Sequence, residues 1–252
     1  MAGSSCEPQQ FRRSVSRPPL PVRGPGALTM EHAYQHRDRD GQPIDLPVGK
    51  IVCIGRNYLD HVRELGNAVP EAPLLFMKPS TAIVGLDAPL RLPEARGSCH
   101  HELELAVLIG RRLTGTSPAA AREAIAGYGL ALDLTLREVQ TELKNKGQPW
   151  ELAKAFDGAC PLSGFVRPEE LPEPQAAELE LLVNGERRQH GSTAQMMHPI
   201  LDLIAHISRH FTLLPGDVVL TGTPAGVTAL QPGDQLRLTL AQYQWQGEVA
   251  AD

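Results

Sequence analysis

Three acidic residues in apolar surroundings are the first candidates for chemistry in this sequence. Glu102 and Glu104 are separated by a single residue, and Asp133 is the only charged residue in the apolar run 129–135. Side chains at positions i and i+2 of a β-strand lie on one face, so the two glutamates would lie side by side. Buried carboxylates without a cation are costly. Three of them form a hard, oxygen-rich ligand set that suits Mg²⁺ or Mn²⁺.

Two other interpretations of these acids stay open on the residues alone. An exposed edge strand shows the same alternation, so the glutamate pair does not distinguish a metal site from a solvent-facing edge. His100 and His101 precede the pair and raise zinc as an alternative, but the sequence contains no HExxH helix.

A histidine and a lysine are the next candidates. The segment 58–65 is predicted to be a helix that ends at Gly66, and His61 and Glu64 would share one of its faces. A carboxylate beside an imidazole orients it and raises its basicity, which favours a role as a general base. Lys154 is a lone cation in the apolar segment 152–156 and could stabilise an oxyanion. A solvated helix and a solvated lysine are the simpler interpretations of these residues taken alone.

The elements that must position these residues are short strands with few helices. The patterns predict strands over 50–55, 74–78, 100–109, 129–135, 218–221 and 235–240, and helices over 118–127, 136–146 and 200–210. Asn184–Gly185 predicts a type I′ turn in a hairpin over 179–189. Because no regular βαβ alternation is present, we predict a strand-dominated α+β fold.

Composition narrows the class of protein. The chain has 252 residues, 42% of them hydrophobic, and a formal net charge of −5. Nucleic acid and anionic membranes require a basic face, so neither is expected as a partner. No apolar run approaches the length of a membrane span. The four cysteines are scattered, which favours free thiols, and Cys53 and Cys160 are expected to be small buried residues.

Residues 1–29 differ from the rest of the chain. They contain Arg12, Arg13, Arg17 and Arg23 but a single acid, Glu7, which is a composition typical of a transit peptide. Several prolines would break an amphipathic helix there. We therefore predict a disordered extension over 1–29, one catalytic domain over 30–252, and a cytoplasmic protein, with organelle targeting as the alternative.

Several motifs together resemble the fumarylacetoacetate hydrolase family. They are Gly55-Arg-Asn-Tyr-x-x-His61, His101-Glu-x-Glu104, Asp133 and Thr221-Gly-Thr-Pro-x-Gly226, in this order, and the resemblance extends from Tyr34 to the C-terminus. It is strongest to the short, single-domain branch of acylpyruvate hydrolases and oxaloacetate decarboxylases or tautomerases. It implies a mixed β-roll of the family's C-terminal-domain type, a homodimer, and Mg²⁺, or alternatively Mn²⁺, bound by Glu102, Glu104 and Asp133.

The resemblance also implies roles for individual residues. His61 and Glu64 would activate water from a mobile lid, and Lys154 would stabilise an enolate. The substrate contacts would come from Arg137 and Gln140, with Arg56, Lys78 and Thr223 as further candidates for binding a carboxylate. The founding members carry an extra N-terminal domain, for which this chain has no room, and a fourth acidic ligand where Ile54 stands here. Both departures favour the short branch.

The expected function is enolate chemistry on a small 2-oxo acid. Such an acid would bind through its carboxylate and ketone oxygens, and acylpyruvate hydrolysis or oxaloacetate decarboxylation, or both, would follow. Enol–keto tautomerisation of oxaloacetate is an alternative, as is isomerisation or decarboxylation of an unsaturated 2-oxo dioic acid in aromatic catabolism. A binding protein of the same fold without turnover is the alternative outside enzymes, and the intact set of candidate residues counts against it.

Overall fold

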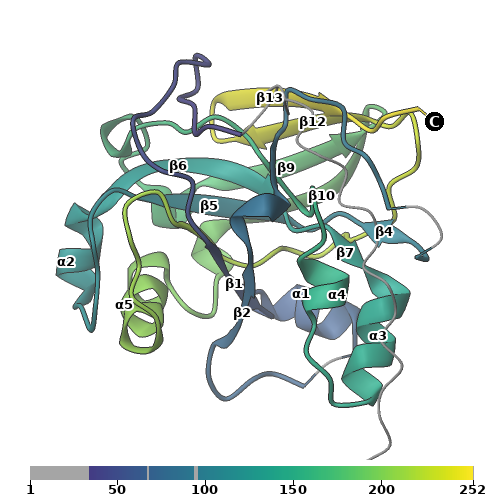
Figure 1. Ribbon diagram of the computed structural model, residues 1–252, viewed down its shortest axis with the longest axis horizontal. Helices are drawn as coiled ribbons and strands as arrows, with labels where there is room; N and C mark the ends of the chain where they lie inside the picture. Colours follow the sequence, from purple (N-terminus) through teal and green to yellow (C-terminus); the bar gives the residue numbers. More distant parts are fainter. Residues whose placement is uncertain (1–33, 67, 94–95, 252) are drawn as a thin grey trace, which may run out of the picture. The chain divides into compact units, whose positions relative to one another are not determined.

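The computed structural model describes residues 34–66, 68–93 and 96–251 (Figure 1). The predicted extension over 1–29, the domain boundary at residue 30 and Cys6 lie outside these ranges. Residues from Tyr34 onward form one structural unit. Within the described ranges, no helix is long and apolar enough to cross a membrane.

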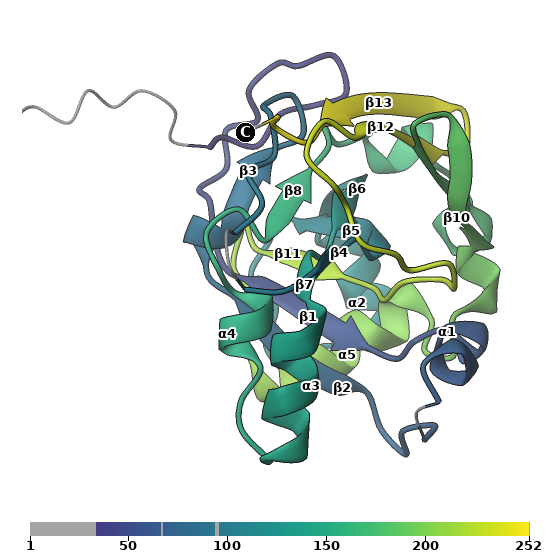
Figure 2. The same cartoon turned by 90° about the vertical axis from the view of Figure 1, so that its right-hand side faces the viewer.

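A seven-stranded mixed sheet forms the centre of this unit (Figures 1 and 2). Two of its neighbouring pairs are parallel, β1 with β11 and β3 with β8, and the other pairs are antiparallel. Its order is β2 (Leu74–Lys78), β1 (Ile51–Gly55), β11 (Val218–Leu220), β5 (Leu103–Ile109), β6 (Ile125–Leu132), β8 (Cys160–Leu162) and β3 (Ile83–Gly85). The short strands β4 (Cys99–His100) and β7 (Thr135–Leu136) pair separately.

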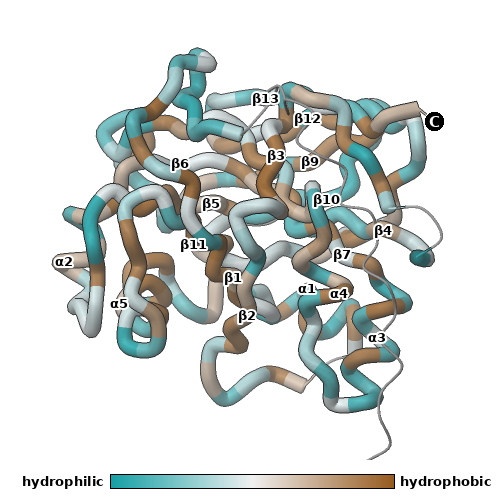
Figure 3. Tube along the Cα trace, viewed as in Figure 1, coloured by the Kyte–Doolittle hydropathy of each residue, from teal (hydrophilic) through white to brown (hydrophobic). Residues whose placement is uncertain are grey.

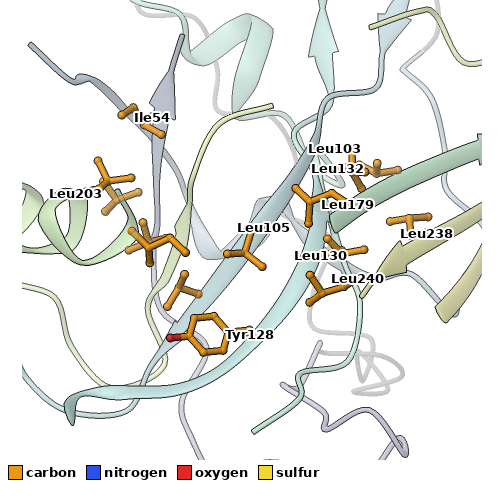
Figure 4. Close-up of a cluster of buried hydrophobic side chains, with 14 of the residues drawn as sticks. Ile54, Leu103, Leu105, Tyr128, Leu130, Leu132, Leu179, Leu203, Leu238 and Leu240 are labelled. Carbon is orange, nitrogen blue, oxygen red and sulfur yellow. The ribbon is translucent and has the colours of Figure 1, made fainter. Parts of the chain in front are cut away.

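A second, antiparallel sheet packs against β5 and β6. Its order is β10 (Glu186–Ser192), β9 (Glu178–Val183), β12 (Gln235–Leu240) and β13 (Tyr243–Glu248). Leucines from β9 and β12 meet leucines from β5 and β6 in one buried cluster (Figure 4). The segments of this core are hydrophobic along the tube of Figure 3, and the outer loops are mostly hydrophilic. The strand-dominated α+β fold is confirmed.

The helices are short and lie around the strands. They are α1 (Leu59–Glu64), α2 (Pro118–Glu123), α3 (Arg137–Asn145), α4 (Glu151–Lys154) and α5 (Ile200–His210), with 3₁₀ turns at Ser80–Ala82, Pro168–Glu170, Pro174–Ala176 and Thr193–Gln195. The predicted helix 200–210 is confirmed, because its apolar residues at helical spacing are buried. Helices α3 and α4 lie beside each other and beside β7 (Figures 1 and 2).

Three predicted elements are interrupted or end several residues early in the structure. The helix expected over 118–127 starts as predicted, with the Ser117 side chain accepting the Ala120 N–H, but it ends at Glu123. Residues from Ile125 onward join β6 instead, since Gly127 lies tightly against Phe165 of a neighbouring segment. The strand expected over 100–109 is interrupted before Leu103, and the strand expected over 129–135 ends at Leu132. Both interruptions fall at the acidic residues.

The hairpin and the cysteines follow the sequence-based expectations. Asn184 and Gly185 have φ values of 53° and 82°, as a type I′ turn requires. Cys53, Cys99 and Cys160 are buried free thiols, and burial raises the pKa of Cys160 to about 12. These thiols are therefore protonated and inert at neutral pH.

Candidate metal centre and active site

Three buried carboxylates converge at the start of β5. Glu102 precedes the strand, Glu104 lies on it, and both are almost fully buried. Asp133 joins them because the chain leaves the sheet after β6, and its backbone N–H donates to the Glu102 carbonyl at 2.8 Å. One carboxylate oxygen from each residue lies within 4.8 Å of the other two. The structure thus brings together the three acids that the sequence singled out.

Three cations surround these carboxylates. The Lys154 ammonium donates to Glu102 at 2.9 Å and to Asp133 at 2.6 Å, and Arg137 donates to the other oxygen of Glu102 at 2.5 Å. The Lys78 ammonium lies 2.8 Å from Asp133 and is fully buried. The charge of the three acids is therefore balanced by protein groups, which the sequence argument for a metal did not anticipate.

The two glutamates differ in how far neighbouring positive charges compensate the negative charge of the carboxylate. Burial alone would raise the pKa of Glu102, but Lys154 and Arg137 hold it below its ordinary value. Burial, together with the charges of Asp133 and Glu102, raises the pKa of Glu104 well above its ordinary value. Among the described residues, Glu104 has no ion pair, and it accepts a hydrogen bond from the Gly222 N–H at 2.6 Å. A divalent cation between the three acids would relieve this repulsion, so the residues fit a Mg²⁺ or Mn²⁺ ion.

Two glycines of the segment 221–226 direct backbone N–H groups into the site. Gly222 and Gly226 have φ values of 93° and 101°, which other residues rarely adopt. Gly222 donates to Glu104, and Gly226 donates to Glu64 at 2.9 Å. A Cβ at Gly226 would lie 2.0 Å from the carbonyl oxygen of Arg188. The motif needs glycine at both positions for geometric reasons.

The His61–Glu64 pair on α1 has the geometry of an oriented base. His61 Nδ1 lies 3.2 Å from Glu64 Oε2. Because a carboxylate only accepts hydrogen bonds, Nδ1 carries a proton, and Nε2 is the nitrogen that holds the lone pair when the ring is neutral. His61 is buried, whereas Glu64 is partly exposed. The helix ends at Glu64 with Leu65 as its C-cap, and Gly66 follows with a φ of 60°, which confirms the predicted C-terminal signal.

Most of the predicted site residues line one pocket. Apolar side chains, including Ile54, Phe76 and Trp150, form part of its wall, so position 54 supplies no metal ligand. The Lys154 ammonium also lies 5.0 Å from the centre of the Phe76 ring. The predicted site residues in the lining are Arg56, His61, Glu102, Glu104, Arg137, Gln140, Lys154 and Thr223.

The remaining predicted residues lie outside that lining. Glu64 contacts His61, and Asp133 accepts a hydrogen bond from Lys154, so each acid touches a residue that lines the pocket. Lys78 does not reach the pocket. Its ammonium is enclosed by Asp133 and by the carbonyl oxygens of Leu134, Ala159 and Lys154, which suits a role in holding the site together better than one in binding substrate.

Gln189 is a buried residue that the sequence did not indicate. Its side-chain oxygen accepts the Leu103 N–H at 2.8 Å and lies 2.9 Å from His101 Nδ1. Its side-chain nitrogen donates to the Thr223 hydroxyl and the Pro224 carbonyl, both at 2.8 Å. Gln189 therefore ties the start of β5, where the glutamates lie, to the loop that carries Thr223.

A β-bulge places Gln189 on the buried face. The register of β10 against β9 shifts between Arg187 and Gln189, so Arg188 is the extra residue. Strict alternation would instead have turned Arg188 inward, opposite buried Leu181. An arginine at an apolar position was the available signal for a bulge, because a buried unpaired charge is costly.

We expect Gln189→Leu to weaken both stability and activity. The substitution leaves buried donors and acceptors unpaired, at about 1–3 kcal/mol each, and should lower Tm by roughly 5–10 °C. Catalytic efficiency should fall further than stability alone explains, because Thr223 loses its donor. Thermal unfolding and steady-state kinetics measure the two effects. Arg187→Leu, on the exposed part of the same strand, is the control, and equal behaviour of the two variants would contradict the role given to Gln189.

Comparison with known proteins identifies the family of this chain. Residues 50–250 match the family described as fumarylacetoacetate (FAA) hydrolase C-terminal. Oxaloacetate tautomerase YcgM of Escherichia coli (strain K12) is 57% identical over 207 residues, which cover 82% of this chain and 94% of the relative.

Solved structures give the same result. A fumarylacetoacetate hydrolase family protein from Yersinia pestis CO92 is 51% identical with a TM-score of 0.85, and the match covers 86% of this chain and 100% of that one. Fumarylpyruvate hydrolase from Pseudomonas aeruginosa, solved with Mn²⁺ and pyruvate, is 32% identical with a TM-score of 0.80, over 88% of this chain and 99% of that one. The resemblance inferred from the motifs is confirmed, and this chain belongs to the fumarylacetoacetate hydrolase family.

Proposed function

We propose that this chain is a divalent-metal-dependent oxaloacetate tautomerase, which interconverts the enol and keto forms of oxaloacetate. The observation that carries the proposal is the His61–Glu64 pair, whose imidazole lines the same pocket as Glu102 and Glu104. The Escherichia coli relative is named an oxaloacetate tautomerase, which supports proton transfer over bond cleavage as the main reaction. The sequence alone had favoured hydrolysis or decarboxylation.

Glu102, Glu104 and Asp133 are the residues that would hold the metal. Mg²⁺ is the proposed ion and Mn²⁺ the alternative, and the Pseudomonas aeruginosa relative solved with Mn²⁺ supports a divalent ion. When bound, such an ion polarises the 2-ketone and stabilises negative charge on its oxygen.

The protein's own groups orient the substrate around that ion. The Arg137 guanidinium, fixed by the Gln140 side-chain oxygen at 2.8 Å, would bind the carboxylate next to the ketone. The Thr223 hydroxyl would contact the same carboxylate from the opposite loop. Burial would lower the pKa of Lys154, but Asp133 and Glu102 hold it above its ordinary value, so this side chain stays an ammonium and favours charge on the 2-oxygen.

His61 would carry the proton at C3. In the enol-to-keto direction, the 2-hydroxyl proton is lost to solvent, the imidazolium gives its Nε2 proton to C3, and the C2=C3 double bond becomes C2=O. The imidazole then regains a proton from solvent. The Glu64 carboxylate accepts the Nδ1–H hydrogen bond throughout, and its charge stabilises the imidazolium before the proton transfer and after reprotonation. The reverse direction removes the C3 proton to Nε2.

Acylpyruvate hydrolysis is the second candidate, because the same base could deprotonate water for attack on a distal acyl carbonyl. The fumarylpyruvate hydrolase relative supports it. Decarboxylation of oxaloacetate would need neither water nor the base. Action on a longer unsaturated 2-oxo dioic acid and a binding role without turnover are the further alternatives.

A substrate panel tests the proposal. The purified protein is assayed with Mg²⁺ or EDTA on enol-oxaloacetate, followed both by loss of the enol and by pyruvate release, and on acetylpyruvate and fumarylpyruvate. We expect metal-dependent enol–keto conversion with the highest kcat/KM of the set. A higher kcat/KM for cleavage of acetylpyruvate or fumarylpyruvate would favour hydrolysis as the main activity. Pyruvate release from oxaloacetate that is faster than enol–keto conversion would favour decarboxylation. A protein that binds these acids without turning any over would be the non-enzymatic alternative.

A further inference from the structure

Asn57 is a fully buried polar residue that the proposed reaction does not use. It lies between β1, which ends at Gly55, and α1, whose N-cap is Tyr58. Arg56, the residue before it, has a φ of 63°, a left-handed conformation that is uncommon for residues other than glycine. Asn57 is not part of the pocket lining, so it is not a substrate contact. Its role must therefore lie in what its side-chain amide holds together.

The Asn57 amide joins two segments that are far apart in the sequence. Its oxygen accepts the His198 N–H at 2.8 Å, and its nitrogen donates to the carbonyl oxygens of His198 at 3.1 Å and Thr221 at 2.8 Å. Because a backbone N–H can only donate, the first contact fixes the amide oxygen at that end and directs both side-chain N–H groups towards the carbonyls. No other side chain of this length offers one acceptor and two donors in this arrangement.

The Thr221 end of this link leads to a proposed metal ligand. Thr221 donates to the Leu105 carbonyl from its backbone N–H at 3.2 Å and from its hydroxyl at 2.9 Å. The next residue, Gly222, donates its N–H to the Glu104 carboxylate at 2.6 Å. The two segments are in close contact, since a Cβ at Gly222 would lie 2.6 Å from Asn57 Cβ. Asn57 thus holds the segment that in turn holds Glu104.

The other end of the link leads to the proposed base. Helix α1 has six residues and no side-chain cap at its N-terminus, and so short a helix is not stable on its own. Its position therefore depends on contacts at its start. The Met197 N–H donates to the Asn57 carbonyl at 2.8 Å, and the Asn57 side chain adds its two bonds to His198. These contacts fix where α1 begins, and with it the position of His61.

We propose that Asn57 is a positioning residue, which holds the helix of the base and the loop of a metal ligand in one fixed arrangement. This role rests on the proposed function, because that function makes His61 the base and Glu104 a metal ligand. Without the amide, α1 and the segment 221–226 should move independently. A displacement of about 1 Å between base and metal centre is enough to lower the rate of proton transfer about 100-fold.

Asn57→Leu tests this role, because leucine has nearly the same shape and no hydrogen-bonding group. We expect kcat to fall about 10- to 100-fold and KM to change less, since Asn57 does not contact the pocket. The Kd for Mn²⁺ should weaken roughly tenfold as Gly222 loosens from Glu104. In the metal-free protein, the backbone N–H groups of residues 58–65 should exchange faster with deuterium. Kinetics are measured with whichever acid of the substrate panel is turned over fastest.

Gln175→Leu is the matched control. The Gln175 amide donates to the Thr193 carbonyl at 2.6 Å and accepts the Ile200 N–H at 2.8 Å, so it is a similar cross-link to the same part of the chain. Within the described residues it has no hydrogen bond to Asn57 or Thr221. Both variants should lower Tm by roughly 5–10 °C. Only Asn57→Leu should change kcat, the Kd for Mn²⁺ and the exchange of α1.

Asn57→Ser is the second variant, because its smaller side chain leaves room for water to pair with the released backbone groups. It should keep a Tm closer to that of the wild type and still lose kcat and Mn²⁺ affinity. The role is overturned if the Asn57 and Gln175 variants behave alike, if Asn57→Ser keeps wild-type kcat and Kd, or if neither Asn57 variant folds while Gln175→Leu does. A wild type without tautomerase activity would refute the proposed function, whereas Mn²⁺ affinity and hydrogen exchange would still test the role of Asn57.

Discussion

A His61→Ala variant is expected to lose about 10²- to 10⁴-fold in kcat for enol–keto conversion, the usual contribution of a positioned general base. The imidazole is the buried partner of Glu64 on α1, and its Nε2 is the nitrogen available to C3. Because His61 is not among the acidic ligands, Mn²⁺ affinity should not change. Steady-state kinetics, corrected for the uncatalysed reaction, measure the loss.

The same variant separates the candidate reactions. If His61 moves the C3 proton, tautomerisation falls and the release of CO₂ from oxaloacetate is affected less. If His61 activates water, acylpyruvate cleavage is lost and decarboxylation is spared. Arg63→Ala on the exposed face of α1 is the control, since Arg63 pairs with Asp60 at the surface. A His61→Ala protein with near wild-type rates would remove the residue from the mechanism.

A Glu104→Gln variant is expected to be more stable than the wild type without metal and less stable with it. The buried carboxylate has a raised pKa and no ion pair among the described residues, so a neutral amide of the same shape removes a repulsive charge. The Gly222 N–H can still donate to the amide oxygen. We expect a gain of roughly 1 kcal/mol in EDTA, or about 2–4 °C in Tm.

Bound metal should reverse this order, so that the wild type becomes more stable than Glu104→Gln. An ion that binds the folded state stabilises it by about 2.7 kcal/mol at 100 times its Kd. The wild type should receive this gain in excess Mg²⁺, and the variant should not. Thermal unfolding in EDTA and in Mg²⁺ gives all four values. Two proteins that respond equally to Mg²⁺ would show that Glu104 is not a ligand.

The pH dependence of the metal-free proteins has a definite sign. A carboxyl whose folded pKa is raised stabilises the fold below its unfolded pKa, near 4.5, and this contribution is lost as the pH rises through the folded value. The advantage of Glu104→Gln should therefore grow as the pH rises above about 4.5. Glu102 has the opposite sign, because its folded pKa is lowered, but it is common to both proteins and cancels in the comparison.

The inner residues of the candidate site could be selected from the sequence because their types are unusual for their surroundings, and the structure places them close together. Acids in apolar runs and a His–Glu pair at helical spacing are visible without a structure. The two glycines near Thr223 also carried a signal, since they need positive φ values. The hairpin at Asn184 and the helix over 200–210 were predictable because short-range turn and periodicity rules fix them.

Other features depend on contacts between distant segments. Gln189 becomes buried only because a bulge at Arg188 shifts the register of β10. Lys78 was a reasonable substrate ligand by residue type, but carbonyl groups from two other segments enclose it. The helix predicted over 118–127 lost its last turn because the apolar residues from Ile125 onward are needed in the central sheet.

Binding of Mn²⁺ is the measurement that tests the metal centre most directly. Titration followed by electron paramagnetic resonance counts the bound ions and gives their Kd for the wild type and for Glu102→Gln and Asp133→Asn. The three-carboxylate site predicts one ion per chain in the wild type, and a Kd at least tenfold weaker in each variant. Stoichiometric binding that is equally tight in all three proteins would contradict it, as would a wild type that binds no ion.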